Sequence, residues 1–146
     1  MLRIKEMKID EIKQLLQRVG YGHLGCVCDN RPYVVPIQYV YNKSNIYIFT
    51  TAGMKTEFIE ANPQVCLQVE EIRDKQHWQS VIVNGRAMRL ESDNDRAFAL
   101  MFIKETNPAR TPALHEQWVG PWTRENVSVI YRIYPDSMTG RKTGDN

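Results

Sequence analysis

The sequence predicts a mainly β protein in which about six antiparallel strands form a small barrel with peripheral helices. The first observation is that apolar residues alternate with a period of two in about six segments, and short turns join most of these segments. The second is that helical spacing is limited to three short stretches. With 146 residues and no internal repeat, the chain is expected to form one domain over 1–146, with the barrel at about 23–137.

The N-terminal segment at about 8–20 is expected to be a helix, because its apolar side chains recur at helical spacing. Asp10 is a candidate N-cap, and Gly20 suits the C-terminal stop. In the next region, odd-numbered residues of the segment 33–41 share one face and even-numbered residues the other. Alternation predicts strands at 24–28, 33–41 and 46–51, with turns at 29–32 and 42–45.

The second half of the chain begins with a short helix at about 54–61. Asn62-Pro63 ends this helix, because proline disfavours helical geometry in the residue before it. Asn94 could cap a third helix at 95–104. The other expected segments are strands at 65–70, 78–90 and 127–133, a charged connection at 71–76, a proline-rich irregular segment at 107–121, and a polar tail at 138–146.

Composition and charge argue against several classes of function. The formal net charge of +2 gives no electrostatic support for nucleic acid as the main partner. No apolar run reaches the roughly 20 residues that a membrane-spanning helix needs, and the charged N-terminus lacks the apolar core of a signal peptide. Three cysteines, an odd number, do not suggest a disulfide framework. We therefore expect a cytoplasmic protein that binds neither nucleic acid nor membrane.

The segment 46–55 has the features of an anion-binding site. A short apolar strand ends in two threonines, the chain turns through Gly53, and Lys55 stands where the second helix begins. Free backbone N–H groups and the positive end of a helix dipole both favour a phosphate at such a place. The alternative is an ordinary strand-to-helix loop in which Thr51 caps the helix and Lys55 is solvated.

Four segments occur in a characteristic order: 31–38 (RPYVVPIQ), 46–55 (IYIFTTAGMK), 61–66 (ANPQVC) and 78–87 (WQSVIVNGRA). As an ordered set, they resemble the split-barrel flavin-binding superfamily of pyridoxamine 5'-phosphate oxidase-like proteins. The closest subgroup is that of flavin-nucleotide-binding proteins related to nitroimidazole reductases. The resemblance implies a six-stranded antiparallel split β-barrel. It also implies a homodimer that holds two FMN molecules at the subunit interface.

The resemblance also implies which residues bind the flavin. Lys55 would contact the FMN phosphate, and Phe49 and Thr50 would line the phosphate and ribityl side. The isoalloxazine ring would meet a second set of residues, namely Pro36, Ile37, Gln38, Ser80 and, flanking Ser80, Trp78 and Val81. A flavin needs an apolar slot, hydrogen bonds to its pyrimidine edge and a cation for its phosphate, and these residue types match those needs. Without the resemblance, the same residues would be read as core strands.

Departures from the family pattern limit what can be transferred. Met54 and Gln38 stand where the true oxidases carry an arginine and a lysine. The C-terminal arginine–histidine substrate motif is absent, since neither Arg132 nor Arg141 has a histidine beside it. Phe49-Thr50 stands where nitroimidazole reductase relatives often have a histidine. Vitamin B6 oxidation and nitroimidazole reduction therefore do not transfer to this chain.

We expect an FMN-dependent oxidoreductase that passes hydride to or from the flavin N5, with a small-molecule substrate or electron donor such as a nicotinamide. No side chain need act as a general acid or base, so the sequence names no catalytic residue. Three alternatives stay open at this point. The slot could hold deazaflavin F420 or haem, the protein could be a non-enzymatic flavin carrier or sensor, or the barrel could have an empty pocket.

Other chemistry-bearing residues have simpler interpretations. Cys26 and Cys28 share a strand face and, with His23, could suggest a metal site, but no second ligand pair exists and free core cysteines are expected. The other candidates are peripheral. We expect Cys66 to be a core residue, and His77 and His115 to be surface or loop residues. Trp118–Trp122 is expected to form an aromatic loop near the pocket. Thr139-Gly140-Arg141 could reach a neighbouring subunit's cofactor or form part of a tail.

Overall fold

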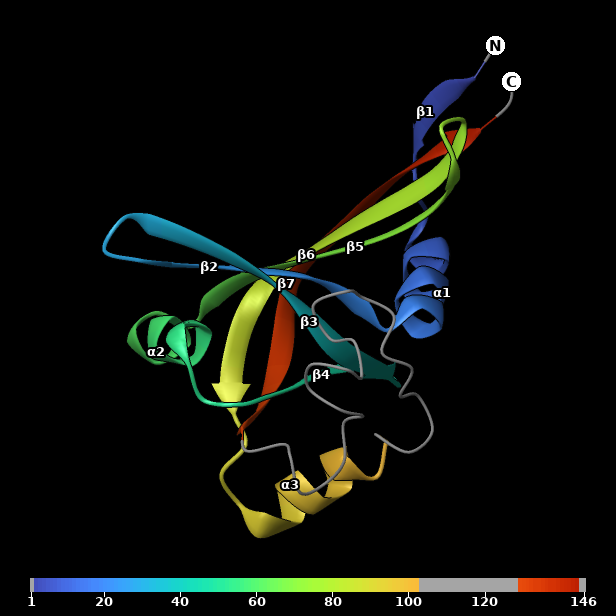
Figure 1. Ribbon diagram of the computed structural model, residues 1–146. Coiled ribbons are helices and arrows are strands. Elements are labelled where there is room, and N and C mark those ends of the chain that lie inside the picture. The colour runs from blue at the N-terminus through green and yellow to red at the C-terminus, as the bar shows by residue number, and fades with distance from the viewer. Residues whose placement is uncertain (1, 103–128, 145–146) are drawn as a thin grey trace, which may run out of the picture.

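The computed structural model describes residues 2–102 and 129–144, and within them the chain forms one sheet flanked by three helices (Figure 1). The strands are β1 (Arg3–Glu6), β2 (Tyr21–Cys28), β3 (Arg31–Asn42), β4 (Asn45–Thr50), β5 (Gln64–Asp74), β6 (His77–Arg89) and β7 (Val129–Gly144). The helices are α1 (Ile9–Val19), α2 (Met54–Ala61) and α3 (Asp93–Leu100).

Six of these strands close into a ring. Each pairs with its neighbour in the antiparallel order β7-β4-β3-β2-β5-β6, and a long pairing between β6 and β7 completes the circle. The ring is split along β7, because β4 pairs only with 129–133 and β1 only with 141–144. The stretch between them pairs with β6, apart from a hydrogen bond from the Met7 N–H to the Gly140 carbonyl oxygen at 2.8 Å. This confirms the predicted mainly β class and the six-stranded antiparallel split barrel.

The alternation of side chains divides the barrel into an inner and an outer surface. In β3 the odd residues Ile37 and Tyr39 share one face, as predicted, and this face is buried in the main core, while Val40 belongs to a second apolar cluster under α3. Helix α1 packs its apolar face against the main core (Figure 1). The largest fully buried side chains in the described part are Tyr39, Tyr131, Leu15, Leu16, Leu24, Ile46, Ile48, Leu67, Ile130, Ile133, Val69 and Val81.

Polar contacts fix α1 against the barrel. Its C-terminus ends at Gly20 in the left-handed conformation, with a φ of 85°, as the sequence predicted. The hydroxyl of Tyr39 donates to the carbonyl oxygen of Leu16 at 2.7 Å and accepts from the N–H of Gly20 at 3.2 Å. Arg18 makes two hydrogen bonds to the carboxylate of Glu71, at 3.0 and 3.1 Å. The last turn of α1 is therefore held by both β3 and β5.

Several expected boundaries differ from the structure. The polar tail expected at 138–146 is wrong for 138–144, which continue β7 along β6 and β1. The connection expected at 71–76 is mostly strand, since β5 runs to Asp74 and β6 starts at His77. Strand β1 was not predicted at all. Ladder hydrogen bonds join backbone groups whatever the side chains are, so polar segments such as these carry no periodic signal.

The helix caps also differ from expectation. Lys8, not Asp10, occupies the N-cap of α1, and its N–H donates to Glu11 Oε1 at 3.0 Å. Helix α3 starts at Asp93, because Ser92 rather than Asn94 accepts the N–H of Asp95 at 3.1 Å. The irregular segment expected at 107–121 lies outside the described residues. None of the helices in the described part is long and apolar enough to cross a membrane.

We expect Gly22→Ala to destabilise the protein by more than about 2 kcal/mol. A Cβ at Gly22 would lie 2.4 Å from the backbone carbonyl oxygen of Gln68, so β2 and β5 would have to move apart. Gly53→Ala is the matched control, because nothing lies within 4 Å of that position and its φ of 174° is ordinary extended backbone. Urea unfolding of both variants measures the difference. A loss at Gly22 no larger than at Gly53 would contradict the packing described for β2.

We expect Glu71→Gln to cost less than about 1 kcal/mol at pH 7, because the ion pair with Arg18 is partly exposed. The hydrogen bonds from Arg18 lower the pKa of the Glu71 carboxyl below its usual 4.5. A carboxyl with a lowered pKa stabilises the fold above its unfolded pKa, and this contribution is lost as the pH falls through the folded value.

The difference between wild type and Glu71→Gln should therefore shrink on acidification through pH 4. Urea unfolding at pH 7 and pH 3 measures it, with Glu91→Gln on the surface as the control. A difference that is unchanged at pH 3 would show that charge is not its source.

Candidate functional site

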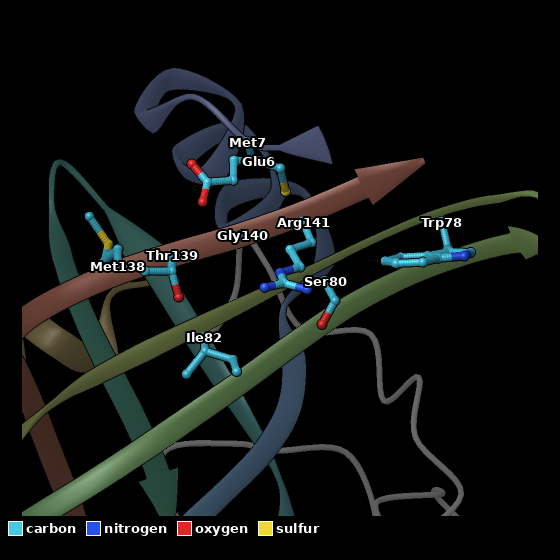
Figure 2. A pocket seen from close by; sticks show the side chains of 9 residues that line it. All are labelled: Glu6, Met7, Trp78, Ser80, Ile82, Met138, Thr139, Gly140 and Arg141. Carbon is cyan, nitrogen blue, oxygen red and sulfur yellow. The ribbon is translucent and has the colours of Figure 1, made fainter. Parts of the chain in front are cut away.

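A cavity of about 600 Å³ opens on the outer side of β6 and β7, next to the connection between β1 and α1 (Figure 2). This volume lies within the range of pockets that bind small molecules and cofactors. Its lining includes Trp78, Ser80 and Ile82 from β6, Thr139 and Arg141 from β7, and Met7 from the β1–α1 connection. The cavity therefore combines an aromatic ring and aliphatic side chains with two hydroxyls, a guanidinium group and the carboxylate of Glu6 from β1.

Strand alternation decides which β6 residues reach the cavity. Ser80 and Ile82 point outward, whereas the side chain of Val81 between them is fully buried in the barrel core. The backbone at Trp78 is fixed to β7, because its N–H donates to Thr143 Oγ1 at 3.1 Å. Of the three β6 residues predicted to meet a flavin, Trp78 and Ser80 thus line the cavity, and the side chain of Val81 does not.

Arg141 is the cation of this cavity. It is the register partner of Ser80 across the β6–β7 ladder, and Figure 2 shows both side chains extending from neighbouring strands into the same region. Its side chain is exposed, and within the described residues its guanidinium group has no hydrogen bond or ion pair. Arg141 is therefore available to an acceptor or an anion in the cavity.

A row of polar side chains leads from Ser80 across the outer face of the sheet. The Nε2 group of Gln68 on β5 donates to Ser80 Oγ at 3.2 Å and more weakly to Glu70 Oε2 at 3.4 Å. The Oε1 atom of the same amide lies 3.3 Å from His23 Nδ1 on β2. His23 is in turn the register partner of Pro36 on β3. These contacts connect the β6 and β3 parts of the predicted site.

Lys55 lies in the first turn of α2, as predicted, and this helix has the predicted bounds of Met54–Ala61. The turn is closed by Thr56, whose Oγ1 accepts the N–H of Gly53 at 2.9 Å and donates to the Gly53 carbonyl oxygen at 2.7 Å. Thr51 is not the cap. The Lys55 ammonium group is half-buried, and burial lowers its pKa. A buried cation without a paired anion is stabilised by binding one.

The remaining predicted residues of β3 and β4 are largely enclosed by the protein. Ile37 is in the main core, Phe49 packs in the cluster under α3, and Thr50 and Gln38 are buried. Pro36 is half-buried on the outer face. Side-chain contact with a ligand is therefore open to Pro36 in this group, whereas the others could contribute only backbone atoms or a small part of their surface.

The predicted residues therefore fall into two groups within one chain. Trp78 and Ser80 lie together at the cavity beside β1 and α1, whereas Lys55 is on α2, at the opposite side of the molecule (Figure 1). The segment Pro36–Gln38 on β3 is connected to the cavity through the row of polar side chains on β2 and β5.

The alternative metal and histidine roles find no support in the geometry. His23 is on the outer face of β2, while Cys26 is buried in the core on the other face. No cluster of three metal-ligating side chains exists in the described part of the chain. His77 contacts Asp74 in the exposed β5–β6 turn, with its Nδ1 atom 2.8 Å from Oδ1. His115 and the Trp118–Trp122 loop lie outside the described residues.

Sequence reasoning missed Gln68 and the role of His23 in this site. Gln68 lies on a strand that alternation predicts, so its outward orientation could have been found from the period of two. His23 lies just before the strand expected at 24–28, because β2 starts earlier, at Tyr21. Their mutual contact depends on the β2–β5 register, in which His23 is opposite Gln68, and one sequence does not reveal that register.

The family model described as pyridoxamine 5'-phosphate oxidase matches residues 8–142. The chain belongs to this family. The uncharacterized protein RA0666 of Rhizobium meliloti (strain 1021) is 32% identical over an alignment of 142 residues, which covers 94% of each chain. The family therefore extends over almost the whole chain, including the strands that carry the cavity and the helix that carries Lys55.

Solved structures show the same fold. A FAD-binding protein of Mesorhizobium loti superposes with a TM-score of 0.77 at 28% identity, over 99% of this chain and 100% of that one. A Bacteroides thetaiotaomicron protein, provisionally named for 5-nitroimidazole antibiotic resistance, gives a TM-score of 0.72 over 100% of this chain and 93% of that one. At 18% identity the second likeness shows the fold alone.

Proposed function

We propose that the protein binds a flavin nucleotide, FMN, and acts as a flavin-dependent oxidoreductase on a small molecule. The observation that carries the proposal is the cavity on β6 and β7, because it contains Trp78 and Ser80, two residues that family resemblance assigns to the flavin. The full-length likeness to a FAD-binding protein at 28% identity supports a flavin as the ligand.

The cavity residues suit the parts of an isoalloxazine ring. Trp78 and Ile82 offer apolar surface to its faces, and Ser80 and Arg141 offer hydrogen-bond donors to its carbonyl oxygens and ring nitrogens. When bound, a flavin supplies hydride and single-electron transfer chemistry. The protein's part is to bind and orient the ring and to hold donors where negative charge accumulates on reduction.

Lys55 suits the phosphate of FMN. Burial of its ammonium group at the first turn of α2 favours a bound anion, and the positive end of the helix dipole acts in the same direction. Met54 beside it is exposed and uncharged, so Lys55 is the cation that α2 provides at this turn. We assign the phosphate to Lys55 and the ring to the cavity.

Because these two groups are far apart in one chain, we propose that each flavin is bound between two copies in a homodimer. One copy provides the cavity with Ser80 and Arg141, and the other provides Lys55. The exposed apolar side chains Val34, Ile72 and Ile82 on the outer surfaces of β3, β5 and β6 would then be covered by the partner.

The purified protein should show the visible absorption of an oxidised flavin, and heat should release FMN. Identification of the released chromophore by mass distinguishes FMN from the second candidate, FAD, which the name of the Mesorhizobium loti protein favours. A colourless protein that also fails to bind added FMN or FAD would refute flavin binding. Oxidation of reduced nicotinamides by the loaded protein would distinguish an enzyme from a flavin carrier.

Lys55→Ala should weaken FMN binding roughly 10- to 100-fold, the loss expected for a charge-assisted hydrogen bond of about 1.5–3 kcal/mol. Riboflavin binding should change little, because riboflavin has no phosphate. Titration of the flavin fluorescence measures both affinities, and Lys75→Ala in the exposed β5–β6 turn is the control. An equal loss for FMN and riboflavin would place the phosphate elsewhere.

Mixed dimers test the shared site. A dimer of one Lys55→Ala chain and one Arg141→Ala chain should bind one FMN with wild-type affinity, because one site receives both damaged groups and the other receives neither. Differently tagged chains allow the mixed dimer to be isolated, and fluorescence titration gives its stoichiometry. If a single chain supplied both groups, every site would carry one lesion and no wild-type site would be found.

A further inference from the structure

The amide of Gln68 has a fixed orientation on the outer face of β5. Its Nε2 atom lies 3.4 Å from Glu70 Oε2, and an ionised carboxylate can only accept hydrogen bonds. The amide nitrogen must therefore be the atom on the Glu70 side. Its second hydrogen is directed to Ser80 Oγ at 3.2 Å. The orientation of the Gln68 amide thus follows from the acceptor-only chemistry of the Glu70 carboxylate.

This orientation determines the role of the groups at both ends of the row. Ser80 Oγ accepts from Gln68, so its own hydrogen is free to point away from the amide, and the cavity that Ser80 lines is one such direction. At the other end, Gln68 Oε1 is an acceptor, so His23 Nδ1, 3.3 Å away, must carry a hydrogen. In neutral His23 this is the Nδ1–H tautomer. The two hydrogen bonds of the row, from His23 to Gln68 and from Gln68 to Ser80, therefore run from His23 toward the cavity.

We propose that Ser80 is a dedicated hydrogen-bond donor to the ligand in the cavity, and that Gln68 and His23 are positioning residues that set this direction. The inference rests on the proposed function in taking the ligand as a flavin. Ser80 then donates to an acceptor atom on the ring, and the donated bond stabilises the reduced, more negative form. A serine without Gln68 could rotate freely and either donate or accept.

Three variants separate this role from simple packing. Ser80→Ala removes the donor and should weaken FMN binding about fivefold, the value of a net hydrogen bond of about 1 kcal/mol. Gln68→Glu should produce a similar loss, because the new carboxylate accepts the Ser80 hydrogen and turns a lone pair toward the ligand. Gln68→Met should cause a smaller loss than Gln68→Glu, since a free hydroxyl can still rotate to donate.

A double-mutant cycle of FMN affinity and flavin reduction potential gives the decisive result. If Gln68 acts through Ser80, Gln68→Glu should have almost no further effect in a Ser80→Ala chain, and each single variant should lower the potential. Additive losses would overturn the proposal, because they would mean that the new charge acts directly on the flavin. Gln64→Glu, the same change on the same outer face of β5, is the control and should leave affinity unchanged.

Determining the tautomer of His23 tests, without any flavin, whether the hydrogen bonds run from His23 through Gln68 to Ser80. Long-range nitrogen–proton NMR on the ligand-free protein, at a pH where the imidazole is neutral, should show the Nδ1–H form. The Nε2–H form would overturn the proposal. A wild-type protein that binds no flavin would refute the proposed function instead, and the NMR result would still decide the direction of the row.

Discussion

The pairing of β6 with β7 is the constraint on which the rest of the structure depends. It closes the barrel, so that every second residue of both strands is fixed in the core, as Val81 and Val83 are. The β6–β7 pairing also continues along β7 beyond the residues that pair with β4. The outward residues Ser80 and Arg141 are therefore held side by side on a rigid ladder, with the space beside them open as a cavity.

Much of the architecture could be predicted from the sequence because it depends on short-range patterns. Helix α2 was predicted with the observed bounds, since a lysine-bearing first turn and an Asn-Pro stop are local signals. The two faces of β3 followed from alternation alone. Segments without such a signal were missed. Polar strand β1 and the end of β7 form because their backbones pair with each other, which side-chain polarity does not indicate.

The candidate site was predicted less completely, because it depends on contacts across strands. Resemblance identified Trp78, Ser80 and Lys55, and the structure places the first two at one cavity and the third on α2. The contact of His23 with Gln68 depends on the register of β2 against β5, which no single sequence specifies. The side chains of Ile37 and Val81 are in the core, because strand alternation buries every second residue of a motif.

The chemistry of the site is that of binding and orientation. It offers an aromatic surface, donors from Ser80 and Arg141, and a half-buried lysine on α2. In the proposed function, the flavin would supply the reactivity when it is bound.

The most direct test of this account is a crystal structure of the protein grown with FMN. The isoalloxazine ring should lie in the cavity of one copy, in contact with Trp78 and Ser80, and the phosphate should lie at Lys55 of the other copy. A flavin bound entirely within one chain, or a cavity that stays free of flavin at saturating FMN, would contradict it.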